Sequence, residues 1–167
     1  MLLVVAPVDF RDEEYLEPRA VIEAHGGQVT VASATLSEAK GMLGARVKPD
    51  LTLGDVRAAD YDAVVFVGGS GASCYWNDPV AHALARNTLK AGKVLGAICI
   101  APVILANAGV LKGRKATVWP SEEGKLAAKG AICNGKPVET DGCLVTANGP
   151  RSARAFGEAL TRILAGE

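Results

Sequence analysis

A cysteine stands where an apolar strand meets a helix, in the segment Val94-Leu-Gly-Ala-Ile-Cys99-Ile-Ala-Pro102. With serine in place of cysteine, this layout forms the nucleophile elbow of hydrolases, a sharp turn that exposes the reactive side chain. Gly96 and Ala101 are small residues that relieve crowding at such a turn, and Pro102 suits a first helical turn. Backbone N–H groups and the helix dipole there favour a thiolate. The sequence therefore predicts a nucleophile at Cys99, and the alternative is a structural cysteine in a buried strand.

A glycine-rich turn, GGSG (68–71), follows the apolar segment 61–67. It lacks the Gly-Lys-Ser/Thr of a phosphate loop and a complete G-x-G-x-x-G pattern, which argues against nucleotide binding. Backbone N–H groups in such a turn approach a ligand closely, and the N–H of Gly69 with that of Ile100 would stabilise a developing negative charge. We therefore predict an oxyanion site, with a plain turn as the alternative.

Acidic residues crowd the first predicted loop and helix, and most of them form a solvated face: Asp9, Asp12, Glu13, Glu14 and Glu17. One carboxylate at this strand end would reach Cys99. Beside a thiolate it would hold a proton, because like charges disfavour joint ionisation, and it would then act as a general acid or base. The only histidines, His25 and His82, lie at no predicted strand end, so a Cys–His dyad has little support.

Strands and helices alternate along most of the chain, which predicts a three-layer α/β sandwich with a mainly parallel sheet. We predict strands at 2–8, 28–34, 45–53, 61–67, 94–98 and 115–119, and helices at 13–25, 79–91, 101–108 and 152–165, with a further helix capped by Ser121 that ends at Lys129. Asp78 is the predicted N-cap of the helix at 79–91. Asn134-Gly135 and Asp141-Gly142 are hairpin signals within antiparallel strand material at 131–147.

The elements must bring three loops together, because ligands of such sheets lie beyond the carboxyl ends of the strands. These loops are 9–14, 68–75 and 99–102. No linker or repeat interrupts the pattern, and 167 residues suit one domain, 1–167. The apolar run 94–106 is shorter than the about 20 residues that a membrane span needs.

Composition excludes several function classes. The formal net charge is zero and aromatic residues make up 5% of the chain, so nucleic-acid binding has little electrostatic support. The four cysteines form no CxxC or CxxH spacing, so we expect no metal site. The N-terminus lacks a signal peptide, which predicts a cytoplasmic protein with free thiols. A net charge near zero also leaves self-association unopposed.

Three segments carry a resemblance to the ThiJ/PfpI superfamily that spans essentially the whole chain: VVFVGGSGA (64–72), GAICIAPVILANAGVLKGRKAT (96–117) and TANGPRSARAFGEAL (146–160). The resemblance implies a flavodoxin-like, class I glutamine amidotransferase-like fold, a homodimer and no cofactor. It places the family's nucleophile on Cys99, and its acidic partner on Glu14 through the match of DEEYLEP (12–18). It places the oxyanion donors on Gly69 and Ile100.

Two further residues have weaker counterparts in the superfamily. Cys74 falls where some bacterial members carry a second cysteine near a dimer-facing loop, and Arg46 matches an arginine near the partner subunit's site. Two positions depart from the pattern. Ile100 stands where PfpI-type proteases have histidine, and Trp119 occupies the region where the deglycase-like branch often has one.

The resemblance implies an enzyme that acts on small reactive carbonyls, with glyoxalase- or deglycase-type chemistry on methylglyoxal or its adducts. A second reading is a redox-sensing stress-response or chaperone-like protein in which Cys99 is oxidised. A third is a PfpI-type cysteine amidase or peptidase, against which Ile100 counts.

Overall fold

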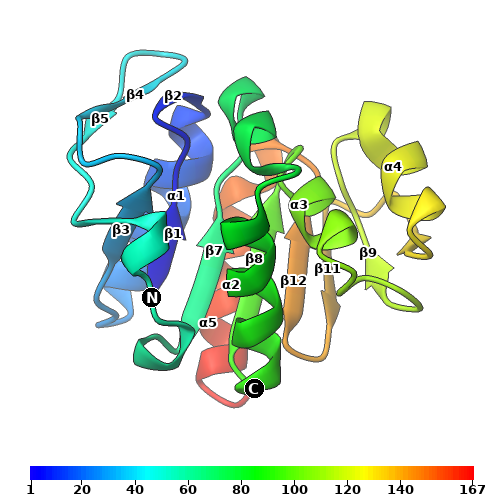
Figure 1. The fold of residues 1–167 in the computed structure, drawn as a ribbon. Helices are drawn as coiled ribbons and strands as arrows, with labels where there is room; N and C mark the ends of the chain where they lie inside the picture. The colour runs from blue at the N-terminus through cyan, green and yellow to red at the C-terminus, as the bar shows by residue number, and fades with distance from the viewer.

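A seven-stranded sheet forms the centre of the computed structural model, which describes residues 1–167 (Figure 1). Its strands are β1 (Leu2–Val4), β3 (Thr30–Ser33), β6 (Leu51–Thr52), β7 (Ala63–Phe66), β8 (Val94–Ile98), β11 (Val138–Asp141) and β12 (Leu144–Ala147). They lie in the order β11-β12-β8-β7-β1-β3-β6, and every neighbouring pair is parallel except β11 and β12. The inner strands are apolar and buried throughout because helices cover both faces of the sheet.

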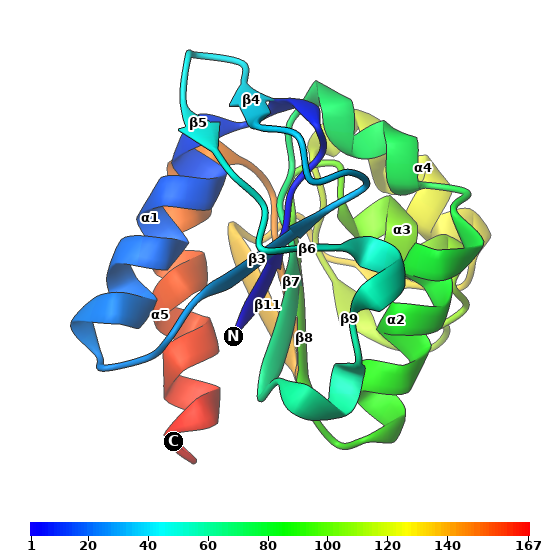
Figure 2. The same ribbon diagram turned by 60° about the vertical axis from the view of Figure 1, so that its left-hand side comes forward.

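Five α-helices form the two outer layers: α1 (Asp12–Ala24), α2 (Pro79–Lys90), α3 (Pro102–Asn107), α4 (Glu123–Ala128) and α5 (Ala153–Leu164). Helices α1 and α5 pack together on one face, while α2 and α3 cover the other (Figure 2). Ile22 and Phe156 belong to the core beneath α1 and α5, and Leu84 and Ile104 belong to the core on the opposite face. The predicted three-layer sandwich, flavodoxin-like in form, is confirmed.

Short 3-10 helices connect several elements: η1 (Leu53–Asp55), η2 (Ala58–Asp60), η3 (Ser70–Tyr75), η4 (Pro120–Glu122) and η5 (Pro150–Ser152). The predicted cap at Asp78 is confirmed, since its carboxylate accepts a 2.8 Å hydrogen bond from the N–H of Val80. The predicted cap at Ser121 is wrong, because Ser121 lies inside η4 and its hydroxyl donates to Glu122. No helix is long and apolar enough to cross a membrane.

The predicted strand at 2–8 is wrong in its second half. β1 ends at Val4, and a separate strand, β2 (Val8–Phe10), pairs with β4 (Ala39–Gly41) in a small sheet completed by β5 (Arg46–Val47). Pro7 has no N–H to continue the ladder of β1, and its carbonyl instead accepts from the N–H of Lys40. The predicted strand at 45–53 likewise divides into β5 and the edge strand β6.

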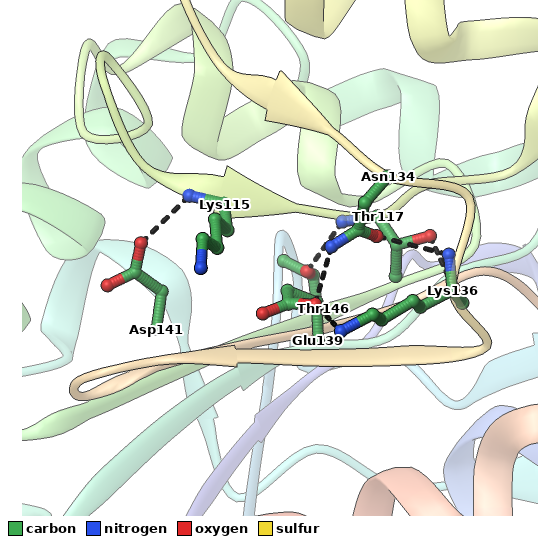
Figure 3. A network of polar contacts seen from close by, with 7 residues as sticks. All are labelled: Lys115, Thr117, Asn134, Lys136, Glu139, Asp141 and Thr146. Carbon is green, nitrogen blue, oxygen red and sulfur yellow. Dashed lines mark hydrogen bonds and ion pairs between the residues drawn. The ribbon is translucent and has the colours of Figure 1, made fainter.

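The C-terminal hairpin is only partly as predicted. Asp141-Gly142 does join β11 to β12, but Asn134-Gly135 forms no hairpin. The strand predicted at 115–119 is shortened to β9 (Lys115–Ala116), which pairs in parallel with β10 (Ile132–Cys133). Figure 3 shows the polar side-chain contacts around β9 and β11. The N–H of Thr117 donates to the side chain of Thr146, and the amide of Asn134 donates to Glu139. The N–H of Thr117, just after β9, thus has a side-chain acceptor instead of a carbonyl on a neighbouring strand.

Candidate active site

Cys99 follows β8 directly and has a left-handed backbone, with φ of 65°. Only one other non-glycine residue, Asp9, has a positive φ. Such a backbone persists only where neighbours hold it. Here the N–H of Cys99 donates to the carbonyl of Ala147 at 2.9 Å, and its own carbonyl accepts from the N–H of Trp119 at 2.8 Å. The structure therefore has the sharp strand-to-helix turn that the sequence predicts.

Two backbone amides lie against the Cys99 sulfur. The N–H groups of Gly69 and Ile100 both act to lower the pKa of the thiol. Gly69 has φ of 102°, and a Cβ added there would lie 2.5 Å from the carbonyl oxygen of Asp9. Only glycine fits this close approach. The pair of amides that the sequence singles out is thus assembled at the sulfur.

Glu14 lies in the first turn of α1 with its side chain fully buried. Neither carboxyl oxygen has a hydrogen-bond partner that meets ordinary geometry. Burial raises the pKa of Glu14 to about 8, while the Cys99 side chain and the Arg11 charge oppose the shift only in part. At neutral pH the carboxyl group therefore keeps its proton beside the thiol, as expected for a buried partner of this cysteine.

The Cys99 thiol does not have the lowered pKa that a helix N-terminus would produce, so that expectation is wrong. Burial, and after it the negative charge of Glu14, raise the pKa of Cys99 to about 12. The sulfur belongs to a residue that is 8% exposed, and α3 has six residues and begins only at Pro102. At neutral pH the pair therefore holds both protons, and one must leave before the sulfur can attack.

A cavity of about 250 Å³ opens onto this pair. Its walls come from six separate segments of the chain: Arg11, Glu14, Met42, Gly69, Ser70, Cys99, Ile100, Trp119 and Pro150. The structure thus brings together the four main residues predicted from the sequence. They meet at the carboxyl ends of the parallel strands, where loops 9–14, 68–75 and 99–102 converge as expected.

Sequence reasoning missed several residues of this cavity. Arg11 ends the loop after β2, so its place at a strand end was the available signal. Its guanidinium pairs with Glu13, with Nε 2.8 Å and Nη2 3.1 Å from the carboxylate oxygens. Met42 lies in the loop between β4 and β5, which Asp12 anchors, and no local pattern predicts that anchoring.

Two of the predicted secondary residues lie outside the cavity. Arg46 is exposed and pairs with Glu38 at 2.9 Å, and Cys74 is an exposed residue of η3. Their roles stay predictions. Neither histidine lines the cavity, since His25 and His82 bond to backbone carbonyls elsewhere. No group of three or more metal-binding side chains is clustered anywhere in the chain.

Trp76 contacts the turn that carries Cys99 from outside the cavity, and no sequence motif predicts this contact. Its indole Nε1–H donates to the carbonyl of Ile100 at 3.0 Å. The carbonyl of Trp76 in turn accepts from Asn107 at 2.9 Å, and the Lys125 ammonium lies 5.1 Å from the centre of the ring system. Trp76 therefore links the turn after β8 to α4 through its side chain and to α3 through its backbone carbonyl.

Known proteins resemble this chain over nearly its whole length. A ThiJ/PfpI domain protein from Brachyspira murdochii, solved by crystallography, superposes with a TM-score of 0.97 at 34% identity and covers 99% of this chain and 96% of its own. An uncharacterized protein of Methanocaldococcus jannaschii is 46% identical over 160 residues, which are 94% of this chain and 78% of that protein.

Two relatives have names that state an activity. The deglycase PfpI of Pyrococcus furiosus is 30% identical over 98% of both chains. A glutathione-independent glyoxalase of Caenorhabditis elegans is 28% identical over 99% of this chain and 88% of its own. The sequence model of the DJ-1/PfpI family matches residues 1–163. With this match and the Cys99 turn in place, the chain belongs to the DJ-1/PfpI family.

Proposed function

We propose that this protein is a cysteine-dependent enzyme that converts small 2-oxoaldehydes, such as methylglyoxal or its adducts, without glutathione. The observation that carries the proposal is the pairing of Cys99 with the buried, protonated Glu14 at the base of a small cavity. Relatives named deglycase and glutathione-independent glyoxalase support the same chemistry.

The first chemical step requires the pair to have lost one proton. The Cys99 sulfur then forms a bond to the aldehyde carbon while its proton passes to the Glu14 carboxylate. The aldehyde oxygen becomes an oxyanion, which the N–H groups of Gly69 and Ile100 stabilise. Glu14 returns the proton to this oxygen, and the product is a hemithioacetal.

The second step moves a hydrogen between the two former carbonyl carbons. The Glu14 carboxylate removes the proton from the carbon bonded to sulfur and returns it to the neighbouring carbon, while the hydroxyl proton of the first carbon passes to the oxygen of the neighbouring ketone through an enediol. The first carbon thus becomes the carbonyl of a thioester, and the second carries the hydroxyl group of a 2-hydroxy acid. Water then cleaves the thioester, releases lactate and restores the Cys99 thiol. The net reaction adds one water to methylglyoxal and needs no external oxidant or reductant.

The dimensions of the site favour a small substrate. The cavity of about 250 Å³ falls below the roughly 300–1,000 Å³ that is usual for pockets that hold drug-sized ligands. An amidase or peptidase is less well supported, because no histidine lines the cavity and Ile100 follows the nucleophile. A homodimer remains part of the proposal, with Arg46 near the partner subunit's site. Equilibrium sedimentation tests that assembly.

The test of the proposed function is methylglyoxal consumption with lactate formation, measured without glutathione. We expect turnover well above buffer for the wild type and none above buffer for Cys99→Ala. Equal rates for the two proteins would refute the proposal. If neither protein converts methylglyoxal, but dilute peroxide oxidises Cys99 of the wild type, seen as added oxygen in its intact mass, the redox-sensing function takes the place of this proposal.

A further inference from the structure

A second and larger cavity, of about 550 Å³, adjoins the one over Cys99. The loops 119–121 and 148–151 line it. Trp119 and Pro150 line both cavities, so a molecule bound to the Cys99 sulfur would extend past these two side chains into the larger space.

The wall between the two cavities is built by a close contact. A Cβ added at Gly149 would lie 2.9 Å from Cζ3 and 3.0 Å from Cε3 of Trp119, so glycine is what allows the indole to lie against this backbone. Trp119 is nonetheless 42% exposed. A large apolar surface thus lines the route out of the Cys99 cavity.

The larger cavity has one charged side chain, Arg151. This exposed guanidinium forms no ion pair and no hydrogen bond within the chain, whereas Arg11 in the smaller cavity is already paired with Glu13. The Asn148 carbonyl oxygen accepts a 2.8 Å hydrogen bond from Ser152, and its amide N–H groups have no acceptor in the chain. No acidic residue lines the larger cavity. Its chemistry is therefore that of an anion-binding site.

We propose that this cavity is a subsite for a carboxylate carried by the substrate, with Arg151 as its charged ligand and Trp119 as its apolar wall. The inference rests on the proposed function and narrows the substrate to 2-oxoaldehydes that bear a carboxylate. A guanidinium suits this role because its planar set of donors matches both carboxylate oxygens, and such charge-assisted bonds are strong.

The test compares two substrates of similar length. One is 4,5-dioxopentanoate, whose aldehyde and ketone are followed by a carboxylate, and the other is the neutral 2-oxopentanal. Addition of water as in the proposed reaction gives 2-hydroxyglutarate and 2-hydroxypentanoate. We expect kcat/KM of the wild type to be about tenfold higher for the anionic substrate, mainly through KM, which is the effect of one charge-assisted contact.

The matched variants are Arg151→Gln and Arg154→Gln, both in exposed arginines near the start of α5. Arg154 pairs with Glu158 at 3.4 Å and lines neither cavity. We expect Arg151→Gln to abolish the preference, Arg151→Lys to retain part of it and Arg154→Gln to leave it unchanged. The proposal is overturned if the wild type does not prefer the anionic substrate, or if Arg151→Gln slows both substrates equally.

A binding measurement separates this inference from the proposed function. Iodoacetamide reacts with the ionised form of a cysteine, and the modification of Cys99 is read on its own peptide, apart from those of the three other free cysteines. A molecule that fills both cavities should slow it. We expect 2-hydroxyglutarate to protect Cys99 at about tenfold lower concentration than 2-hydroxypentanoate in the wild type, and equal protection in Arg151→Gln. Protection without turnover would refute the proposed function and retain the subsite. Turnover without a difference in protection would refute the subsite alone.

Discussion

Glu14 and Cys99 meet on either side of a single glycine. A Cβ added at Gly68 would overlap Oε2 of Glu14 and would lie 2.5 Å from Cβ of Cys99. The carboxyl group reaches the Cys99 side chain because this position has no side chain. The glycine-rich turn after β7 therefore serves the pair in two ways, since Gly68 leaves space for it and Gly69 supplies an N–H to the sulfur.

Gly68→Ala should disrupt the site and the fold together. The added methyl group must displace Glu14, Cys99 or the carbonyl oxygen of Ile98, which would lie 2.6 Å away. Overpacking of this kind costs about 1–3 kcal/mol in the free energy of unfolding. Urea denaturation measures it. Gly124→Ala in α4 is the control, because nothing lies within 4 Å of its added Cβ and alanine favours a helix. Equal stability of Gly68→Ala and the wild type would contradict the geometry.

The stability of the protein should depend on pH through Glu14. Burial raises the folded-state pKa of this carboxyl from 4.5 to about 8, so the folded protein holds the proton more tightly than the unfolded chain. The contribution of the protonated Glu14 carboxyl to the free energy of unfolding is complete below about pH 4.5 and is lost as pH rises through about 8. The free energy of unfolding should fall by an amount on the order of a few kcal/mol over that window. Glu14→Gln, compared with the wild type by denaturation between pH 5 and about pH 8.5, should lack this decline.

Much of the site follows from local sequence. The alternation of strands and helices predicts which loops meet at one edge of the sheet. The position of Cys99 between an apolar strand and Pro102 predicts the sharp turn at this residue. The burial of Glu14 was predictable only in outline, because five acidic residues share that segment and the resemblance alone selected one. The raised pKa of Cys99 was not predictable, since it depends on how deeply six separate segments of the chain bury the sulfur.

Small strands were predicted least well for a related reason. The apolar run at 2–8 continues beyond β1 in sequence, but the chain leaves the main sheet before Pro7. The next strand, β2, pairs instead with β4, a segment some thirty positions away. Asn134-Gly135 has the composition of a hairpin turn, yet the strands on either side of it pair elsewhere, β10 with β9 and β11 with β12. Pairings of this kind leave no periodic pattern in the sequence.

Trp76→Phe should weaken the turn that carries Cys99. Phenylalanine retains most of the apolar surface but removes the N–H that donates to Ile100. Loss of that bond should cost about 1–3 kcal/mol of stability. The rate of Cys99 alkylation by iodoacetamide should change as well, because the same peptide segment supplies an N–H to the sulfur. A variant that loses stability with an unchanged alkylation rate would limit Trp76 to a packing role.

Asp12→Ala should release the loop that carries Met42 over the cavity. Asp12 Oδ1 accepts from the N–H of Leu43 at 3.0 Å, and Oδ2 accepts from that of Ala45 at 2.7 Å. Without these acceptors the amide hydrogens of both residues should exchange with solvent at least about tenfold faster, because each lost hydrogen bond is worth about 1 kcal/mol or more. Hydrogen exchange read by NMR measures this. Glu17→Ala, in an exposed residue of the same helix, should leave both rates unchanged.

Glu14→Gln distinguishes a Glu14 that carries protons for Cys99 during carbonyl conversion from one that only fills space beside it. Glutamine keeps the shape of the side chain but removes its acid–base function. We expect kcat for methylglyoxal to fall by about 10²–10⁴-fold while Cys99 stays accessible to iodoacetamide. A Glu14→Gln protein that forms lactate at the wild-type rate would contradict the proton-carrying role.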